Sequence, residues 1–209
     1  MPTARVAVAR KRGYHHGDLR RALIEAALRL IHEKGPRGFT LREVARRVGV
    51  THTALYRHFP NKTALLAAAA EDGFHALKSA IVRACLKVPD PLARFQQAGI
   101  AYVRFAVAHP SHFRVMFRDE TTSAGHPSLQ KVKDETFTLV VSEIEACQRE
   151  GLVRAGSTTE LALAAWAIVH GLAVLLVDRS PRIKRIRASA DQLARLVTRT
   201  LMEGMARRG

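Results

Sequence analysis

A short stretch of the sequence, residues 52–58, contains five side chains suited to binding nucleic acid: His52, Thr53, Tyr56, Arg57 and His58. Imidazole, hydroxyl and guanidinium groups reach base edges or phosphate oxygens, and a tyrosine ring can contact a thymine methyl group or a phosphate. On one short helix these groups form one polar, aromatic face, as a helix needs if it is to enter the DNA major groove. An alternative for Tyr56 and His58 is partial packing against a preceding helix, which does not exclude a contact with DNA.

The residues before this stretch predict a second helix and a tight turn that would position it. Thr40 is expected to cap the preceding helix, and Glu43 three residues later completes a capping box. Gly49 supplies the turn, because a left-handed backbone costs glycine little. Thr51 caps the third helix and Pro60 ends it. The buried side of the preceding helix is expected to consist of Leu41, Val44, Ala45 and Val48. The pattern is typical of a helix-turn-helix.

Further DNA contacts are expected on both sides of that unit. Thr40 and Arg42, at the start of the supporting helix, would touch the DNA backbone. Lys62 starts the next helix, where a phosphate contact would be reinforced by the helix N-terminus. The residues predicted to bind DNA are Thr40, Arg42, Thr51, His52, Thr53, Tyr56, Arg57, His58 and Lys62.

The spacing of apolar residues predicts an all-α protein of about nine helices. Asp18 is expected to cap the first helix, which ends at Gly35 and Pro36, and Asn61 to cap the fourth. The predicted ranges are 18–34, 41–48, 51–59, 62–87, 91–108, 110–118, 127–150, 158–179 and 188–207. Three parts follow: a basic flexible arm over 1–13, a DNA-binding domain over 14–62, and a larger helical regulatory and dimerisation domain over 63–209.

The charge of the chain is concentrated at its N-terminal end. The 209 residues carry a net charge of +16. Residues 1–62 contain 14 Lys and Arg against 4 Asp and Glu, a net charge of +10, and the remaining residues contribute +6. A basic region that coincides with a helix-turn-helix is the electrostatic signature of phosphate binding. The alternative is a charge that serves solubility or reflects an arginine-rich coding bias.

Cysteine content and hydropathy indicate a protein of a reducing, aqueous compartment, so a cytoplasmic location is expected. Cys85 and Cys147 form no CxxC pair, and the first residues lack the apolar segment of a signal peptide. The longest apolar stretch, 161–177, is interrupted by His170 and Gly171 and is shorter than the roughly 18 residues that span a bilayer. A redox role for the cysteines is disfavoured, because isolated cysteines in apolar helical patterns are usually buried and inert. No membrane partner is expected.

The region 40–62 resembles the DNA-binding domain of the tetracycline-repressor (TetR) family of bacterial regulators. The matching residues are Thr40, Val44, Ala45, Gly49, Val50, Thr51, Leu55, Tyr56, His58, Phe59 and Lys62. Gly35 and Phe39 also suit the approach to this motif. The resemblance implies a recognition helix over 51–58, with Tyr56 and Lys62 on phosphates and His52 and Thr53 reading bases. The basic residues 10–12 could reach an adjacent groove, or form a solvated tail.

A second, shorter resemblance covers part of the C-terminal half. Trp166, His170 and Gly171, together with residues 109–117, resemble the TetR subgroup named for a tryptophan-histidine-glycine signature. That resemblance implies a homodimer in which the last two helices of each chain form a four-helix bundle. Apolar residues on more than one face of 161–176 and 193–201 support a partner subunit independently. The alternative is that these residues form an intramolecular core.

A pocket for a small hydrophobic effector would lie between the C-terminal helices, as ligand sites in bundles do. Its candidate residues are Phe95, Tyr102, Phe105, Phe113, Met116, Phe117, Phe137, Val141, Trp166 and His170. Each of them could instead be a core residue, and His170 is favoured as a partner for a hydrogen bond with Trp166, four residues earlier.

No metal or other cofactor is expected. His109, His112 and His126 could bind a transition metal in principle, but no cysteine completes the set, and cap or core roles are favoured. The sequence also lacks a nucleophile motif, a phosphate loop and paired carboxylates, so an enzyme is not expected.

These patterns together predict a homodimeric transcriptional repressor that binds a palindromic operator in double-stranded DNA and is released by an effector. Half-sites would lie about one helical turn apart. An activator, or a constitutive DNA-binding protein without an effector, would share every N-terminal feature. A helical enzyme is a more remote alternative.

Overall fold

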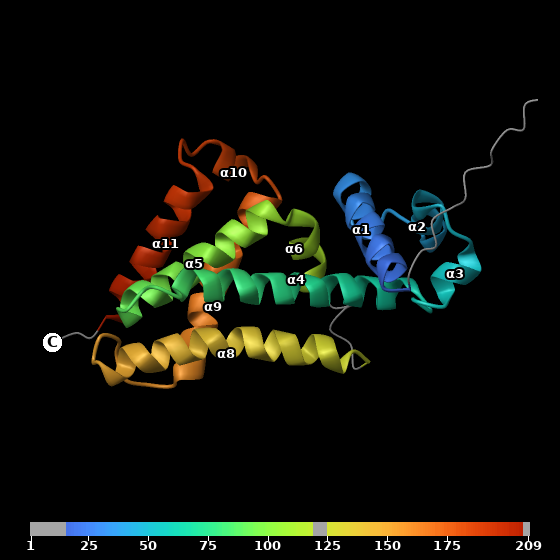
Figure 1. Ribbon diagram of the computed structural model, residues 1–209. Coiled ribbons are helices and arrows are strands. Elements are labelled where there is room, and N and C mark those ends of the chain that lie inside the picture. Colours follow the sequence, from blue (N-terminus) through green and yellow to red (C-terminus); the bar gives the residue numbers. More distant parts are fainter. Residues whose placement is uncertain (1–15, 119–124, 207–209) are drawn as a thin grey trace, which may run out of the picture.

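The computed structural model describes residues 16–118 and 125–206, and these residues form an all-α protein (Figure 1). The helices are α1 (His16–Lys34), α2 (Leu41–Val48), α3 (His52–Tyr56), α4 (Lys62–Cys85), α5 (Pro91–Ala108), α6 (Pro110–Met116), α8 (Pro127–Arg149), α9 (Thr158–Val177), α10 (Pro181–Lys184) and α11 (Ala190–Met205). The predicted fold class is confirmed. The predicted arm over 1–13 lies outside the described residues.

Helices α1, α2 and α3 form one end of the molecule (Figure 1). Their shared core contains Leu23, Ile31, Val44 and Leu55, which are all fully buried. Helix α1 begins at His16, so Asp18 lies inside the helix and the prediction that Asp18 is its N-cap is wrong. An acidic residue is favourable anywhere in a first turn, and the sequence therefore does not distinguish the cap from the positions after it.

Helix α4 connects the two halves of the molecule. At about 1.5 Å per residue its 24 residues span roughly 36 Å. It packs against α1 of the head and against α5, α6 and α8 of the larger half. Residues 65–70 are buried without interruption, because helices surround this part of α4 and its alanines let them approach closely. At Gly73 the approach is closest: a Cβ atom there would lie 2.8 Å from the Met116 sulfur.

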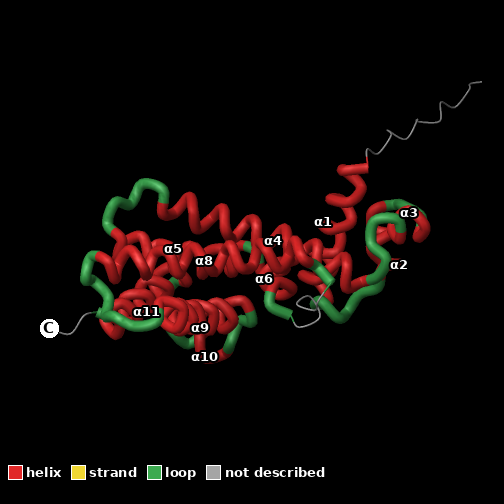
Figure 2. Tube along the Cα trace, turned by 90° about the horizontal axis from the view of Figure 1, so that it is seen from below, coloured by secondary structure: helices red, strands yellow, loops and turns green. Residues whose placement is uncertain are grey.

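Helix α5 is the centre of the larger half and packs against α4, α8, α9 and α11. Helices α9 and α11 lie side by side, as Figure 2 shows. The sequence missed α10, because Ser180 and Pro181 indicate a break; here Pro181 instead begins a four-residue helix. The other predicted helices end within about three residues of their observed bounds, as fraying ends usually do.

By length and composition α9 could cross a membrane, since its 20 residues have a mean hydropathy of 2.1 over the best window. A core helix passes the same test, and 39% of that window is buried here against α5, α8 and α11. The remaining surface of α9 carries exposed apolar side chains, including Leu163, Ile168 and Leu175. Helix α9 is therefore a packed helix with one uncovered apolar face.

Candidate DNA interface and ligand cavity

The turn between α2 and α3 has the geometry of a helix-turn-helix. Gly49 adopts the left-handed conformation, with φ of 76° and ψ of 32°. Val50 N–H donates to the Ala45 carbonyl oxygen at 3.0 Å, and Gly49 N–H to that of Arg46 at 3.2 Å, which satisfies the last carbonyls of α2. Thr51 then caps α3 by accepting a hydrogen bond from Ala54 N–H at 3.3 Å. The predicted turn and cap are confirmed.

The polar side chains of α3 lie on its outer face. His52, Thr53, Tyr56 and Arg57 are exposed, and Tyr56 keeps 50% of its surface accessible. The rings of His52 and Tyr56 meet edge to face with centroids 6.4 Å apart. His58 is half-buried at the end of this segment. The structure therefore brings the predicted base-reading side chains together with Tyr56, while Leu55 anchors the opposite face in the core.

Hydrogen bonds and an ion pair fix the start of helix α2. The Thr40 capping box is complete: Thr40 N–H donates to Glu43 Oε2 at 2.8 Å, and Glu43 N–H donates to Thr40 Oγ1 at 3.3 Å. Lys34 Nζ donates to Glu43 Oε1 at 2.6 Å, and this bond, with the one from Thr40, lowers the pKa of Glu43 to about 2. Arg42 is exposed at the start of the same helix.

Two nitrogens of Arg47 donate hydrogen bonds to the two carboxylate oxygens of Glu33 in α1, at 2.6 and 3.0 Å. This bidentate pair and the bond between Lys34 and Glu43 both join α1 to α2. Arg47 is exposed on α2 while it is bound to the neighbouring helix. Its role in orienting α2 was not predicted, because the pairing of residues 14 positions apart depends on how the two helices cross.

Lys62 has an intramolecular role that the sequence did not predict. Its ammonium donates to the carbonyl oxygen of Phe39 at 2.6 Å and to that of Arg37 at 3.2 Å. The same nitrogen lies 4.1 Å from the centroid of the Phe39 ring. Lys62 thus fastens the start of α4 to the segment that leads into α2. Backbone carbonyl groups belong to every residue, so no sequence pattern signals this contact.

A cavity of about 430 Å³ lies between α4, α5, α8 and α9. Its lining residues are Phe74, Leu77, Ile81, Tyr102, Phe117, Lys133, Asp134, Thr136, Phe137, Val140, Trp166 and His170. Five of the predicted pocket residues are among them, namely Tyr102, Phe117, Phe137, Trp166 and His170. The contributions of α4 and α8 were largely missed, because only the tertiary arrangement turns these faces toward α9.

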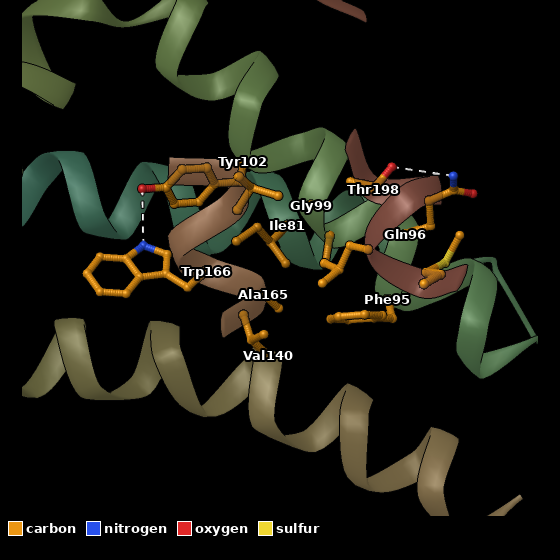
Figure 3. Close-up of a pocket in the computed structure, with 13 residues that line it drawn as sticks. Ile81, Phe95, Gln96, Gly99, Tyr102, Val140, Ala165, Trp166 and Thr198 are labelled. Carbon is orange, nitrogen blue, oxygen red and sulfur yellow. Dashed lines mark hydrogen bonds between the residues drawn. The ribbon is translucent and has the colours of Figure 1, made fainter. Parts of the chain in front are cut away.

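The other predicted pocket residues lie elsewhere. Phe95 lines an adjoining hollow of about 40 Å³, which shares Ile81, Tyr102, Val140 and Trp166 with the cavity. Phe95 lies at the end of this hollow away from Trp166 and Tyr102 (Figure 3). Phe105 packs against His109, with ring centroids 4.9 Å apart. Phe113 and Met116 are buried in the main core, and Val141 packs against a second core that contains Phe95. For Val141 the reason is angular: Val140, one position earlier and about 100° away around α8, faces the cavity instead.

A hydrogen-bonded chain of three side chains forms one wall of the cavity. Trp166 Nε1 donates to the Tyr102 hydroxyl oxygen at 3.3 Å (Figure 3), and that hydroxyl lies 2.7 Å from His170 Nδ1. The predicted direct bond between His170 and Trp166 is replaced by this link through Tyr102. Burial raises the pKa of the Tyr102 hydroxyl and lowers the pKa of His170, so both groups are held neutral near pH 7.

Two of the histidines considered as metal ligands lie at helix ends, and both cysteines have thiols of low reactivity. Within the described ranges no group of three or more His, Cys, Asp or Glu residues could hold a metal ion. His109 lies at the junction of α5 and α6, and His126 at the start of α8. Burial raises the pKa of the Cys85 thiol, and that of Cys147 to about 11, which makes both thiols poor nucleophiles at neutral pH.

A helix-turn-helix head on a helical domain with a cavity between its helices defines a DNA-binding regulator. Residues 23–69 match the family described as bacterial regulatory proteins of the tetR family. Residues 95–201 match the tetracyclin repressor-like C-terminal domain. The chain belongs to the TetR family of bacterial transcriptional regulators. Members of this family bind operator DNA and dimerise, and they are regulators and not enzymes.

Curated relatives show where the similarity is concentrated. The chain is 28% identical over 137 residues to the nucleoid occlusion factor SlmA of Marinobacter nauticus, which covers 66% of this chain and 70% of that protein. It is 52% identical to the class C tetracycline repressor of Escherichia coli, but over 52 residues, or 25% of this chain and 24% of the repressor. The high identity to the tetracycline repressor is therefore confined to a quarter of the chain, whereas the lower identity to SlmA extends over two thirds of it.

Solved structures share the fold across both halves. A protein of unknown function from Rhodococcus sp. RHA1 superposes with a TM-score of 0.80 at 32% identity, covering 94% of this chain and 100% of that one. AibR, solved in complex with isovaleryl coenzyme A and operator DNA, has a TM-score of 0.71 at 19% identity, covering 88% and 97%. At that identity the likeness to AibR shows the fold alone.

Proposed function

We propose that this protein is a cytoplasmic, homodimeric repressor that holds a palindromic operator and releases it when a small hydrophobic effector occupies the cavity of about 430 Å³. The observation that carries the proposal is the course of α4. Phe74, Leu77 and Ile81 of this helix line the cavity, and Lys62 at its other end binds the segment before α2. One rigid helix thus touches both the effector cavity and the DNA-binding head.

Tight packing supports transmission along α4. Because a Cβ atom on Gly73 would lie 2.8 Å from the Met116 sulfur and 3.2 Å from His112 Cβ, α4 and α6 have no space to move independently there. Helix α6 also packs against α1 of the head. A ligand that displaces α4 would therefore shift the head as well, and a coupling of about 1–3 kcal/mol suffices for regulation.

The partner subunit is proposed to cover α9 and α11. Leu163 and Leu196 keep 53% and 58% of their surfaces exposed, and Ile168 and Leu175 are exposed on α9 as well. A Cβ atom on Gly171 would meet no heavy atom within 4 Å, so this glycine opens a place for close approach by another helix. Four such helices, two from each chain, would bury this apolar surface.

On the DNA, His52 and Thr53 are proposed to read bases, and Tyr56 and Lys62 to contact phosphates, with support from Thr40, Arg42, Thr51, Arg57 and His58. The exposure of the α3 face supports these roles. The DNA-binding domain is taken to cover 14–62 and the regulatory domain 63–209. In AibR, a similar fold holds an acyl coenzyme A and operator DNA, which supports an effector site and an operator site in one chain here.

The test is selection of bound fragments from genomic DNA by the purified protein, with and without extracts of small molecules. We expect an inverted repeat with half-sites about one helical turn apart, located over a promoter, and weaker binding when an effector is present. A bound consensus without inverted symmetry would contradict the dimeric reading of DNA. Binding that no small molecule alters, or a site upstream of an activated promoter, would favour the constitutive or activator alternative.

A further inference from the structure

The cavity of about 430 Å³ has few polar groups among its apolar walls, and the chain of Trp166, Tyr102 and His170 is one of them. Trp166 Nε1 can only donate, so the Tyr102 hydroxyl oxygen accepts from it, and we assign to His170 the tautomer in which Nδ1 accepts the Tyr102 proton. His170, kept neutral by burial, then carries its own proton on Nε2. Among the described residues this N–H has no acceptor. The Thr136 hydroxyl offers no proton to the cavity, since it donates to the Val132 carbonyl oxygen at 2.6 Å.

The lining also carries one ammonium group and one carboxylate, both on α8. Lys133 is half-buried and is the single cation in the described lining. It makes no ion pair or hydrogen bond with any residue of 16–118 or 125–206. Its neighbour Asp134 is exposed, and its Oδ1 accepts from Gln130 Nε2 at 2.7 Å. Outside the cavity, by contrast, the lysines of this region are paired: Lys78 and Lys131 both contact Glu135, at 2.7 and 4.0 Å.

We infer that the cavity takes an apolar molecule with one anionic oxygen group, of which a carboxylate is the simplest. The aromatic and aliphatic walls contact its hydrocarbon part, Lys133 neutralises its charge, and His170 Nε2–H donates to an oxygen of the same molecule. Ammonium–carboxylate hydrogen bonds are among the stronger ones in proteins, so Lys133 would select such ligands over neutral ones. The inference rests on the proposed function, since it names the chemical class of the effector of that site.

The chain provides its own reporter for a test, because Trp166 is its single tryptophan and lines the cavity. We suggest titrating the full-length protein with decanoate and with decan-1-ol while following Trp166 fluorescence. Decanoate is expected to bind about 10-fold more tightly than the alcohol, as a hydrogen bond to a charged group would provide. In Lys133→Met, the affinity for decanoate should fall by about 10-fold, and the affinity for decan-1-ol should be unchanged. Lys131→Met, on the exposed side of the same helix, should behave as the unaltered protein does.

Three results would overturn the inference: equal affinity for the two probes, an equal loss of both in Lys133→Met, or no saturable change in fluorescence with either probe. Release of the selected operator DNA is measured separately, by fluorescence anisotropy of labelled DNA. Selective decanoate binding without release of the DNA would contradict the proposed effector response, but it would still support the inferred ligand class of the cavity. Release by a neutral or cationic molecule alone would contradict the ligand class and leave the proposed function standing.

Discussion

Lys62 Nζ lies 2.6 Å from the carbonyl oxygen of Phe39 and 4.1 Å from the centre of the Phe39 ring. One ammonium group thus joins the first residue of α4 to the segment before α2. The same group also stands near the surface where phosphates are proposed to bind. Stability and DNA affinity are therefore expected to depend on this residue together, which distinguishes it from the exposed residues of α3.

Replacing Lys62 with methionine should lower both the stability of the protein and its affinity for DNA. We expect the free energy of unfolding, from urea titration, to fall by about 1–3 kcal/mol, because two carbonyl oxygens lose a charged donor. DNA affinity should fall as well, and the dependence of log K on log salt should flatten by about 0.9 if the ammonium also contacts a phosphate. Unchanged stability would contradict the anchoring role. Arg42→Met, at an exposed position, is the control for loss of charge alone.

His52→Ala and Thr53→Ala should change which sequences are bound. Both side chains are exposed, so stability should stay within about 0.5 kcal/mol of the starting protein. Each substitution should alter the preference at one position per half-site by about 1–3 kcal/mol, measured by repeating the selection of bound DNA. Tyr56→Ala is the matched comparison on the same helix, and should weaken binding to all sequences alike. An unaltered consensus in both variants would argue against base reading.

Leu163→Glu and Leu196→Glu should separate the subunits. Each leucine is more than half exposed in the single chain, so a charged residue there leaves the fold intact. Buried in a dimer, it would place a carboxylate in an apolar interface, which is strongly unfavourable. Analytical ultracentrifugation should show monomers with an unchanged helical circular dichroism spectrum. Leu86→Glu, 73% exposed at the end of α4, should remain dimeric. Dimers that persist in both variants would place the interface elsewhere.

Acid should destabilise the protein partly through Glu43. The pKa of this carboxyl is about 2 in the folded protein against 4.5 as its ordinary value. Its contribution to stability is therefore full above about pH 4.5 and is lost as the pH falls toward 2. Glu43→Gln should make the free energy of unfolding less dependent on pH across this interval, in urea titrations at several pH values. Glu25→Gln, an exposed partner of Arg21, should leave the dependence unchanged.

Local signals were sufficient for the DNA-binding head. The Thr40–Glu43 capping box, the left-handed Gly49 and the Thr51 cap each depend on residues within four positions of one another, and all three appear as predicted. A side chain that caps a helix start bonds the backbone beside it, so sequence spacing alone specifies the contact. The spacing of apolar residues likewise identified the buried face of α2, because helical periodicity is a local property.

Only the tertiary structure decided the rest, because its contacts join residues far apart in the chain. The Lys62 anchor spans 23 positions, and the bond between Tyr102 and His170 spans 68. Apolar spacing predicted a helix over 127–150. The crossing of α4, α5, α8 and α9 determined that Lys133 and Val140 line the cavity while Val141 does not. The sequence by itself therefore determined how this protein presents a helix to DNA, and the packing of distant helices determined the shape and charge of the cavity that would control it.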